Sequence, residues 1–157
     1  MILLAAAFAA AVAAQPRADD GESIAGPWRL LTWLPMVERP VCMVRAAGAE
    51  VNLDIILNKA GEPILIAARP DWKHSGDAEI GLTIDGDPPR TLQGQMLANL
   101  VLIPLSDLLV RRLKQAKAVQ LALPFGRFRA NVAEFGAALS ALQACGARIG
   151  ATRPAAS

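Results

Sequence analysis

Short runs in which every second residue is apolar dominate the first two thirds of the chain. The clearest is Glu50–Asn58, where four apolar residues alternate with polar ones that include Asn52 and Asp54. A period of two is typical of a β-strand with one buried face. The turn Lys59–Glu62 separates this run from a second apolar run, Pro63–Ala68. The two runs therefore predict an antiparallel hairpin.

Similar patterns recur along the chain and predict several further short strands. The turn Asp85-Gly86-Asp87 joins two of them and favours a second hairpin. We expect an edge strand at Pro27–Leu34 and a loop at Arg69–Asp77. The further predicted strands are Val41–Arg45, Ala78–Asp85, Arg90–Leu97, Ala98–Ile103, Ala118–Leu123 and Arg127–Arg129.

Two late segments change from strand-like to helical spacing. Pro104–Lys117 places its leucines three and four residues apart and predicts an amphipathic helix. Asn131 precedes Glu134 at the spacing of a helix N-cap, so a second helix is expected from Val132. Gly146 is a natural stop for that helix. Strands without regular βαβ alternation, followed by two helices, indicate an α+β, β-rich class. The predicted domain is an antiparallel sheet, or a β-sandwich-like arrangement, of six to eight short strands.

The N-terminus resembles a secretory signal. Residues 1–14 contain an apolar run of signal-peptide length that ends in small alanine-rich positions. We expect a polar, unstructured lead-in at 15–26, one folded domain at 27–149 and a frayed tail at 150–157. No later segment reaches about 18 uninterrupted apolar residues, so no transmembrane segment is expected after cleavage. The expected location is periplasmic or secreted. The alternative is that residues 1–14 form a buried N-terminal helix.

Charge and aromatic content narrow the class of partner. The chain of 157 residues has a net charge of +2, with acidic and basic residues mixed throughout. A nucleic-acid binder would need a stronger and more concentrated basic surface. Only three tryptophans, four phenylalanines and no tyrosines are present. So few aromatic residues make a binding site of stacked aromatic rings for sugars or single-stranded nucleic acid improbable.

The sequence permits one intramolecular disulfide, between Cys42 and Cys145. An even cysteine count in an exported chain favours such a bond. The bond would tie an early strand to the second predicted helix. The alternative is a pair of separate buried thiols.

Several segments, taken in order, resemble the invasion-associated locus B family of exported bacterial proteins. The hairpin Gly81–Gly86 is followed by the leucine-rich helix Leu105–Lys114 and the strand Ala118–Leu123. The pattern Phe135-Gly136-x-Ala138-Leu139-x-Ala141-Leu142 comes last. The resemblance implies a β-rich periplasmic or envelope domain without established enzymatic activity. It supplies no catalytic residues for this chain.

Residue types for catalysis occur together only around His74, the single histidine. Ser75 with Asp71 or Asp77 would complete the residue types of a hydrolytic triad, although triad members normally come from separate elements. A solvated loop is the simpler interpretation. One histidine and two distant cysteines cannot form a tetrahedral zinc site. Asp85-Gly86-Asp87 lacks the pattern of a calcium-binding EF-hand loop, so no metal and no cofactor is expected.

The leading hypothesis is a non-enzymatic exported domain that acts through protein or envelope contact, in an accessory or invasion-associated-like role. Four basic residues near the end of the first helix form a candidate patch for an unknown envelope protein or an anionic surface, and Arg127 and Arg129 would extend it if their strand lies alongside. The alternatives are a β-domain that binds a small apolar ligand and an envelope hydrolase that uses His74. The patch consists of Arg111, Arg112, Lys114 and Lys117, and the candidate ligand-lining residues are Trp28, Trp33 and Trp72.

Overall fold

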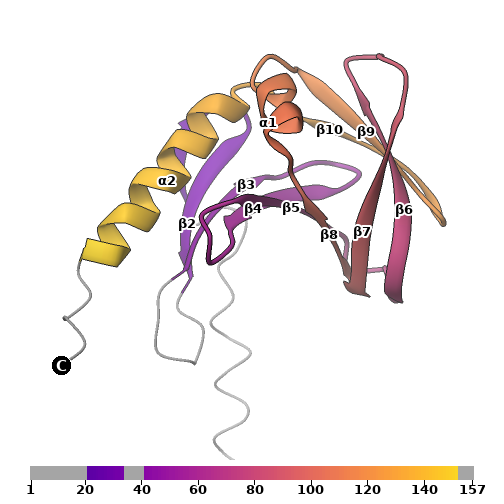
Figure 1. Ribbon diagram of the computed structural model, residues 1–157, viewed down its shortest axis with the longest axis horizontal. Helices are drawn as coiled ribbons and strands as arrows, with labels where there is room; N and C mark the ends of the chain where they lie inside the picture. The colour runs from indigo at the N-terminus through magenta and orange to yellow at the C-terminus, as the bar shows by residue number, and fades with distance from the viewer. Residues whose placement is uncertain (1–20, 34–40, 152–157) are drawn as a thin grey trace, which may run out of the picture.

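The computed structural model describes residues 21–33 and 41–151 (Figure 1). The predicted signal peptide, residues 15–20 of the lead-in and residues 152–157 of the tail lie outside these ranges. Within them the chain forms ten strands and two helices. The strands are β1 (Glu22–Ala25), β2 (Trp28–Trp33), β3 (Val41–Ala46), β4 (Asn52–Leu57), β5 (Pro63–Ala68), β6 (His74–Ile84), β7 (Arg90–Ala98), β8 (Leu100–Pro104), β9 (Ala118–Leu123) and β10 (Gly126–Asn131). The helices are α1 (Asp107–Leu113) and α2 (Phe135–Ala151).

All ten strands belong to one antiparallel sheet with the order β1-β2-β3-β4-β5-β8-β7-β6-β9-β10. The sheet curves strongly, and α2 lies along the side that contains β2 (Figure 1). The predicted α+β class and the antiparallel pairing are confirmed. The predicted count of six to eight strands is too low, and the strands form a single continuous sheet.

The structure has additional strand residues in polar segments, which form backbone hydrogen bonds with a neighbouring strand. Glu22–Ala25 falls in the predicted unstructured lead-in but pairs with β2 as β1, so β2 is not an edge strand. β6 begins at His74, inside the segment predicted as a loop. Ala98 has a φ of 54°, which reverses the chain between β7 and β8. Leu97 therefore pairs with Leu100 across a tight turn.

The core lies on the inner face of the curved sheet, under α1 and α2. Alternate residues of each strand point inward, as the period-two pattern requires. Trp28 is fully buried and packs edge-on against Phe135 of α2, with ring centroids 6.0 Å apart. Its indole Nε1–H donates to the carbonyl of Ala133 at 2.9 Å. This contact fastens β2 to the segment that leads into α2.

A disulfide joins Cys42 of β3 to Cys145 of α2, which confirms the predicted pairing. The two half-cystines are 103 residues apart in sequence and both are buried. Gly146 follows directly, and a Cβ added there would lie 3.8 Å from Leu57 of β4. The bond thus closes most of the domain into one covalent loop, with α2 held close to the sheet.

The helix ends differ from the predicted ones. Ser106 caps α1, its hydroxyl accepting from the Leu109 N–H at 3.3 Å, so α1 is shorter than Pro104–Lys117. Asn131 accepts from the Ala133 N–H and caps a turn, not the helix. Glu134 has a φ of 62°, which delays the start of α2 to Phe135. Gly146 does not end the helix, which continues to Ala151.

Candidate interaction site

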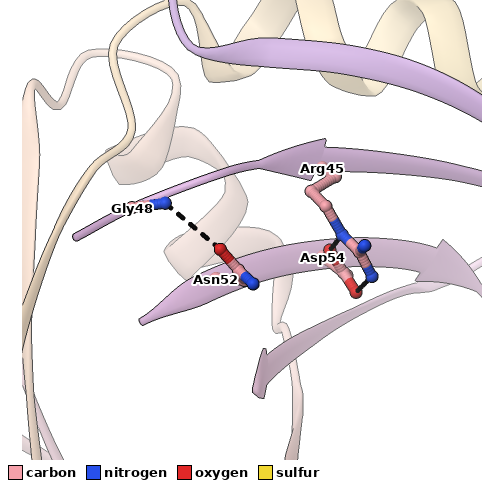
Figure 2. Close-up of polar contacts among 4 residues, drawn as sticks. All are labelled: Arg45, Gly48, Asn52 and Asp54. Atoms are coloured by element: carbon pink, nitrogen blue, oxygen red, sulfur yellow. Dashed lines mark hydrogen bonds and ion pairs between the residues drawn. The ribbon is translucent and has the colours of Figure 1, made fainter. Parts of the chain in front are cut away.

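A buried ion pair lies on the outer face of the sheet, opposite the helices. Arg45 of β3 and Asp54 of β4 are directly paired across the two strands. The Arg45 Nε donates to Asp54 Oδ1 at 2.6 Å and its second nitrogen donates to Oδ2 at 2.7 Å (Figure 2). The side chains are 20% and 5% exposed. A planar guanidinium matches a carboxylate in this two-bond geometry, which fixes both groups.

The contact with Asp54 favours the charged form of Arg45. The hydrogen bond to Asp54 raises the pKa of Arg45 above its ordinary value, and burial opposes the shift. Asp54 is the one buried charged residue in the described part of the chain. Breaking such a pair leaves an uncompensated charge in a poorly hydrated place, so each partner depends on the other.

The ion pair lies in the wall of a hollow of about 440 Å³, called here the sheet-face hollow. Nearby, Asn52 accepts from the Gly48 N–H at 3.3 Å (Figure 2). The hollow combines a half-buried apolar surface with amide and guanidinium groups. Its lining residues are Met43, Arg45, Asn52, Asp54, Ile66, Ala68, Arg69, Pro70, Asn99 and Leu100.

A second ion pair borders the hollow. Arg69 donates two bonds of 2.8 Å to the carboxylate of Asp71. This contact lowers the pKa of Asp71. The Arg69 guanidinium also lies 5.2 Å from the ring centre of Phe128, a cation–π arrangement. Each arginine of the hollow thus has its own carboxylate, and the charges compensate one another.

Of the predicted ligand-lining tryptophans, the structure describes the side chains of Trp28 and Trp72. Trp28 is in the core, and Trp72 is also buried there, 5% exposed, against Phe125 and Phe128. Trp33 lies in β2, but its side chain is outside the described part of the structure. The geometry gives no support to a ligand cavity lined by Trp28 and Trp72.

His74 lies at the start of β6 and is exposed. Its ring stacks on Phe125, with the ring centres 4.0 Å apart and the planes 6° apart. No hydrogen bond joins it to Ser75, Asp71 or Asp77 in the described residues. The arrangement therefore does not assemble the groups that a His74-dependent hydrolase would need.

The basic patch is divided between paired and unpaired cations. Arg112 bonds to Asp87 of the β6–β7 turn at 3.0 Å, whereas Arg111, Lys114 and Lys117 are exposed. The same turn holds this region in place through Asp85. Its carboxylate accepts from the backbone N–H of Lys117 at 3.0 Å and from that of Ala118 at 2.9 Å.

These bonds to Asp85 hold the Asp85-Gly86-Asp87 turn against the start of β9. They lower the pKa of the Asp85 carboxyl. Among the residues that the structure describes, no group of His, Cys, Asp and Glu could hold a metal ion. None of the described helices is long and apolar enough to span a membrane.

The Arg45–Asp54 pair is the feature that the sequence pattern did not reveal. The alternation of Glu50–Asn58 places Asp54 on the face opposite the apolar residues and gives no sign that it is buried. The partner was not identifiable, because Arg45 reaches Asp54 only through the register of β3 with β4. The one sign of the pair in the sequence is a single acidic residue, Asp54, between two apolar neighbours.

These features define a β-rich α+β domain with one antiparallel sheet and a disulfide between the sheet and its long helix. The same fold is found in the crystal structure of invasion associated protein B from Bartonella henselae, with a TM-score of 0.64 and 17% sequence identity. The match covers 82% of this chain and 97% of that one. No protein-family model and no curated protein matches the chain. The resemblance to the invasion-associated locus B proteins is thus confirmed at the level of the fold.

Proposed function

We propose that this protein is an exported cell-envelope domain that acts by binding another protein and not by catalysis. The observation that carries the proposal is the sheet-face hollow. Its polar groups are fixed in advance by the Arg45–Asp54 and Arg69–Asp71 pairs, beside half-buried apolar side chains. Protein-binding surfaces combine an apolar centre with well-placed polar groups in this way.

The charges of the hollow favour a protein partner over a small ion. Because each guanidinium is already neutralised, a free anion or cation gains little by entering. A partner with neutral hydrogen-bonding groups can still use the nitrogen of Arg45 that does not bond to Asp54, together with the amides of Asn52 and Asn99. Apolar contact with the half-buried Met43 and Leu100 would supply the remaining affinity.

An exported location is supported by three observations. Residues 1–14 have the pattern of a signal peptide, and Cys42 is bonded to Cys145, as is common in oxidising compartments. The structure that shares the fold carries the name invasion associated protein B. We propose an accessory or invasion-associated-like role in the envelope. The basic patch at Arg111, Lys114 and Lys117 is a second candidate contact.

Site-specific photo-crosslinking in the source organism tests the proposal. A photoreactive residue is placed at Asn99, in the hollow, or at Ser140, an exposed position on α2. We expect a discrete protein adduct from Asn99 in the envelope fraction, no adduct from Ser140, and a chain shortened by signal cleavage. Equal adducts at both positions, or a full-length chain that stays in the cytosol, would contradict the proposal.

A further inference from the structure

Among the described strands, β10 ends the sheet and pairs with β9 alone. In an antiparallel pair, successive residues direct their backbone groups alternately toward the partner and away from it. Val132, just after β10, donates its N–H to the carbonyl of Lys117, beside β9. Arg129 has the opposite parity, and its N–H donates away from β9 to Glu50 at 2.6 Å. The free edge is therefore formed by the odd-numbered residues of β10.

This edge presents both backbone groups and positive charge. Arg127, Arg129 and Asn131 direct N–H and carbonyl groups outward, and all three residues are exposed. The Arg127 and Arg129 side chains have no carboxylate partner among the described residues. Because residues two apart share a face, both guanidinium groups extend from the outer face of the same edge.

Glu50 shows which chemical group the edge binds. It lies in the loop between β3 and β4, 79 residues before Arg129, and its carboxylate accepts the Arg129 N–H. Within 21–33 and 41–151, no other outward N–H of β10 has a partner. The short donor–acceptor distance is typical of a charge-assisted hydrogen bond. The edge thus already binds a carboxylate from elsewhere in the chain, next to two unpaired arginines.

We propose that the β10 edge is a strand-pairing site for an extended segment of a partner protein with acidic residues at alternate positions. The segment adds as a further antiparallel strand, its backbone bonding to Arg127, Arg129 and Asn131. Its acidic side chains lie opposite the two arginines, about 5 Å away between Cβ atoms. Glu50 occupies the site until the segment replaces it. The inference rests on the proposed protein-binding function but concerns residues other than those that line the sheet-face hollow.

Peptide binding to the purified domain tests the inference. The probe is a fluorescein-labelled peptide, Thr-Val-Glu-Val-Glu-Val-Thr, and its control has lysine in place of glutamate. Fluorescence anisotropy is expected to show saturable binding of the acidic peptide alone. Glu50→Ala removes the internal competitor and is expected to tighten binding about tenfold. Glu79→Ala, which removes an exposed carboxylate from β6, is the matched control and leaves the affinity unchanged.

A second pair of variants separates backbone pairing from simple charge attraction. Arg127→Ala removes the guanidinium but retains the edge N–H, whereas Arg127→Pro removes both and spares the hydrogen bonds to β9. We expect a few-fold weakening for Arg127→Ala and loss of binding for Arg127→Pro. Circular dichroism confirms that each variant is folded.

Three results would overturn the inference: equal binding of both peptides, equal affinities for Arg127→Ala and Arg127→Pro, or self-association of Glu50→Ala without peptide binding. The last would mean that Glu50 protects the edge against pairing with a second copy. These results leave the proposed function intact if crosslinking from Asn99 still yields its adduct. Loss of that adduct, with peptide binding retained, would remove the sheet-face hollow from the proposal and leave the β10 edge in place.

Discussion

The Cys42–Cys145 bond is expected to supply a large part of the stability of the domain. It closes a loop between residues 103 apart in sequence. For a loop of about 100 residues, the chain-entropy relation gives about 4.7 kcal/mol, because the cross-link restricts the unfolded chain. Measured values commonly fall below this relation. We therefore expect removal of the bond to lower the free energy of unfolding by about 3–4 kcal/mol.

Urea unfolding of three samples measures this loss. The samples are the oxidised protein, the same protein in reductant, and the variant Cys42→Ala with Cys145→Ala. Alanine is preferable to serine because both sites are buried. A serine at either site would bury a hydroxyl without a hydrogen-bond partner. The two forms without the bond should lose similar stability, and their m-values should rise because a chain without the cross-link exposes more surface when unfolded. Near-ultraviolet circular dichroism should show the same native fold in all three.

The reasoning fails if both forms without the bond lose less than about 1 kcal/mol, well below the loop-closure value. It also fails if the variant loses far more than the reduced protein does. In that case packing of the two sulfur atoms, and not restriction of the unfolded chain, would account for the effect. The variant should not respond to reductant, which serves as its internal control.

Three further predictions concern single positions. Asp54→Ala leaves the Arg45 guanidinium without its carboxylate and is expected to lower the free energy of unfolding in urea by about 3 kcal/mol. Adding Arg45→Met to the same chain should restore most of this loss, because it removes the unpaired charge. A loss that Arg45→Met does not restore would contradict a charge-based cause. Gly94→Ala places a Cβ against Ile80 Cδ1 and 3.0 Å from the Leu102 carbonyl oxygen, so it should lose about 1–3 kcal/mol, whereas Gly150→Ala, which has open space, should be neutral or stabilising. The pKa of Asp85 is lower in the folded protein than its value near 3.8 in the unfolded chain. The ionised carboxylate therefore stabilises the fold above pH 3.8, and this stabilisation is lost as the pH falls through the lower folded pKa. Asp85→Asn should therefore reduce the fall in melting temperature between pH 5 and pH 2, and an unchanged fall would contradict this role.

The strand pattern was largely readable from the sequence, because burial on one face of a sheet imposes a period of two. The segments Glu50–Asn58 and Pro63–Ala68 formed the expected hairpin as β4 and β5. Segments without this signal were missed or shortened. β1 is short and has no buried residue, so its sequence, Glu-Ser-Ile-Ala, shows little alternation. The first turn predicted for α2 was lost to a positive φ at Glu134, which the N-cap spacing at Asn131 does not reveal.

The candidate surfaces were harder to predict than the fold, because each brings together residues whose proximity depends on tertiary structure. Arg45 meets Asp54 through strand register. Glu50 reaches the N–H of Arg129 only because the sheet curves back toward the β3–β4 loop. The disulfide was predictable for the opposite reason, since two cysteines allow only one intramolecular bond.

The two ends of the sheet differ in a way that favours β10 as the edge for a partner. At the other end, β1 lies close to α2, and a Cβ added to Gly26 would come within 3.1 Å of the Ala133 carbonyl oxygen. A strand added beside β1 would meet this helical side of the domain. β10 has no helix packed along it to a comparable extent in the described residues, and a single side chain, Glu50, bonds to its outward N–H groups. Native proteins block exposed edges with charged side chains, prolines, bulges or a covering segment. A single carboxylate is a reversible block, and a partner that supplies carboxylates of its own can replace it.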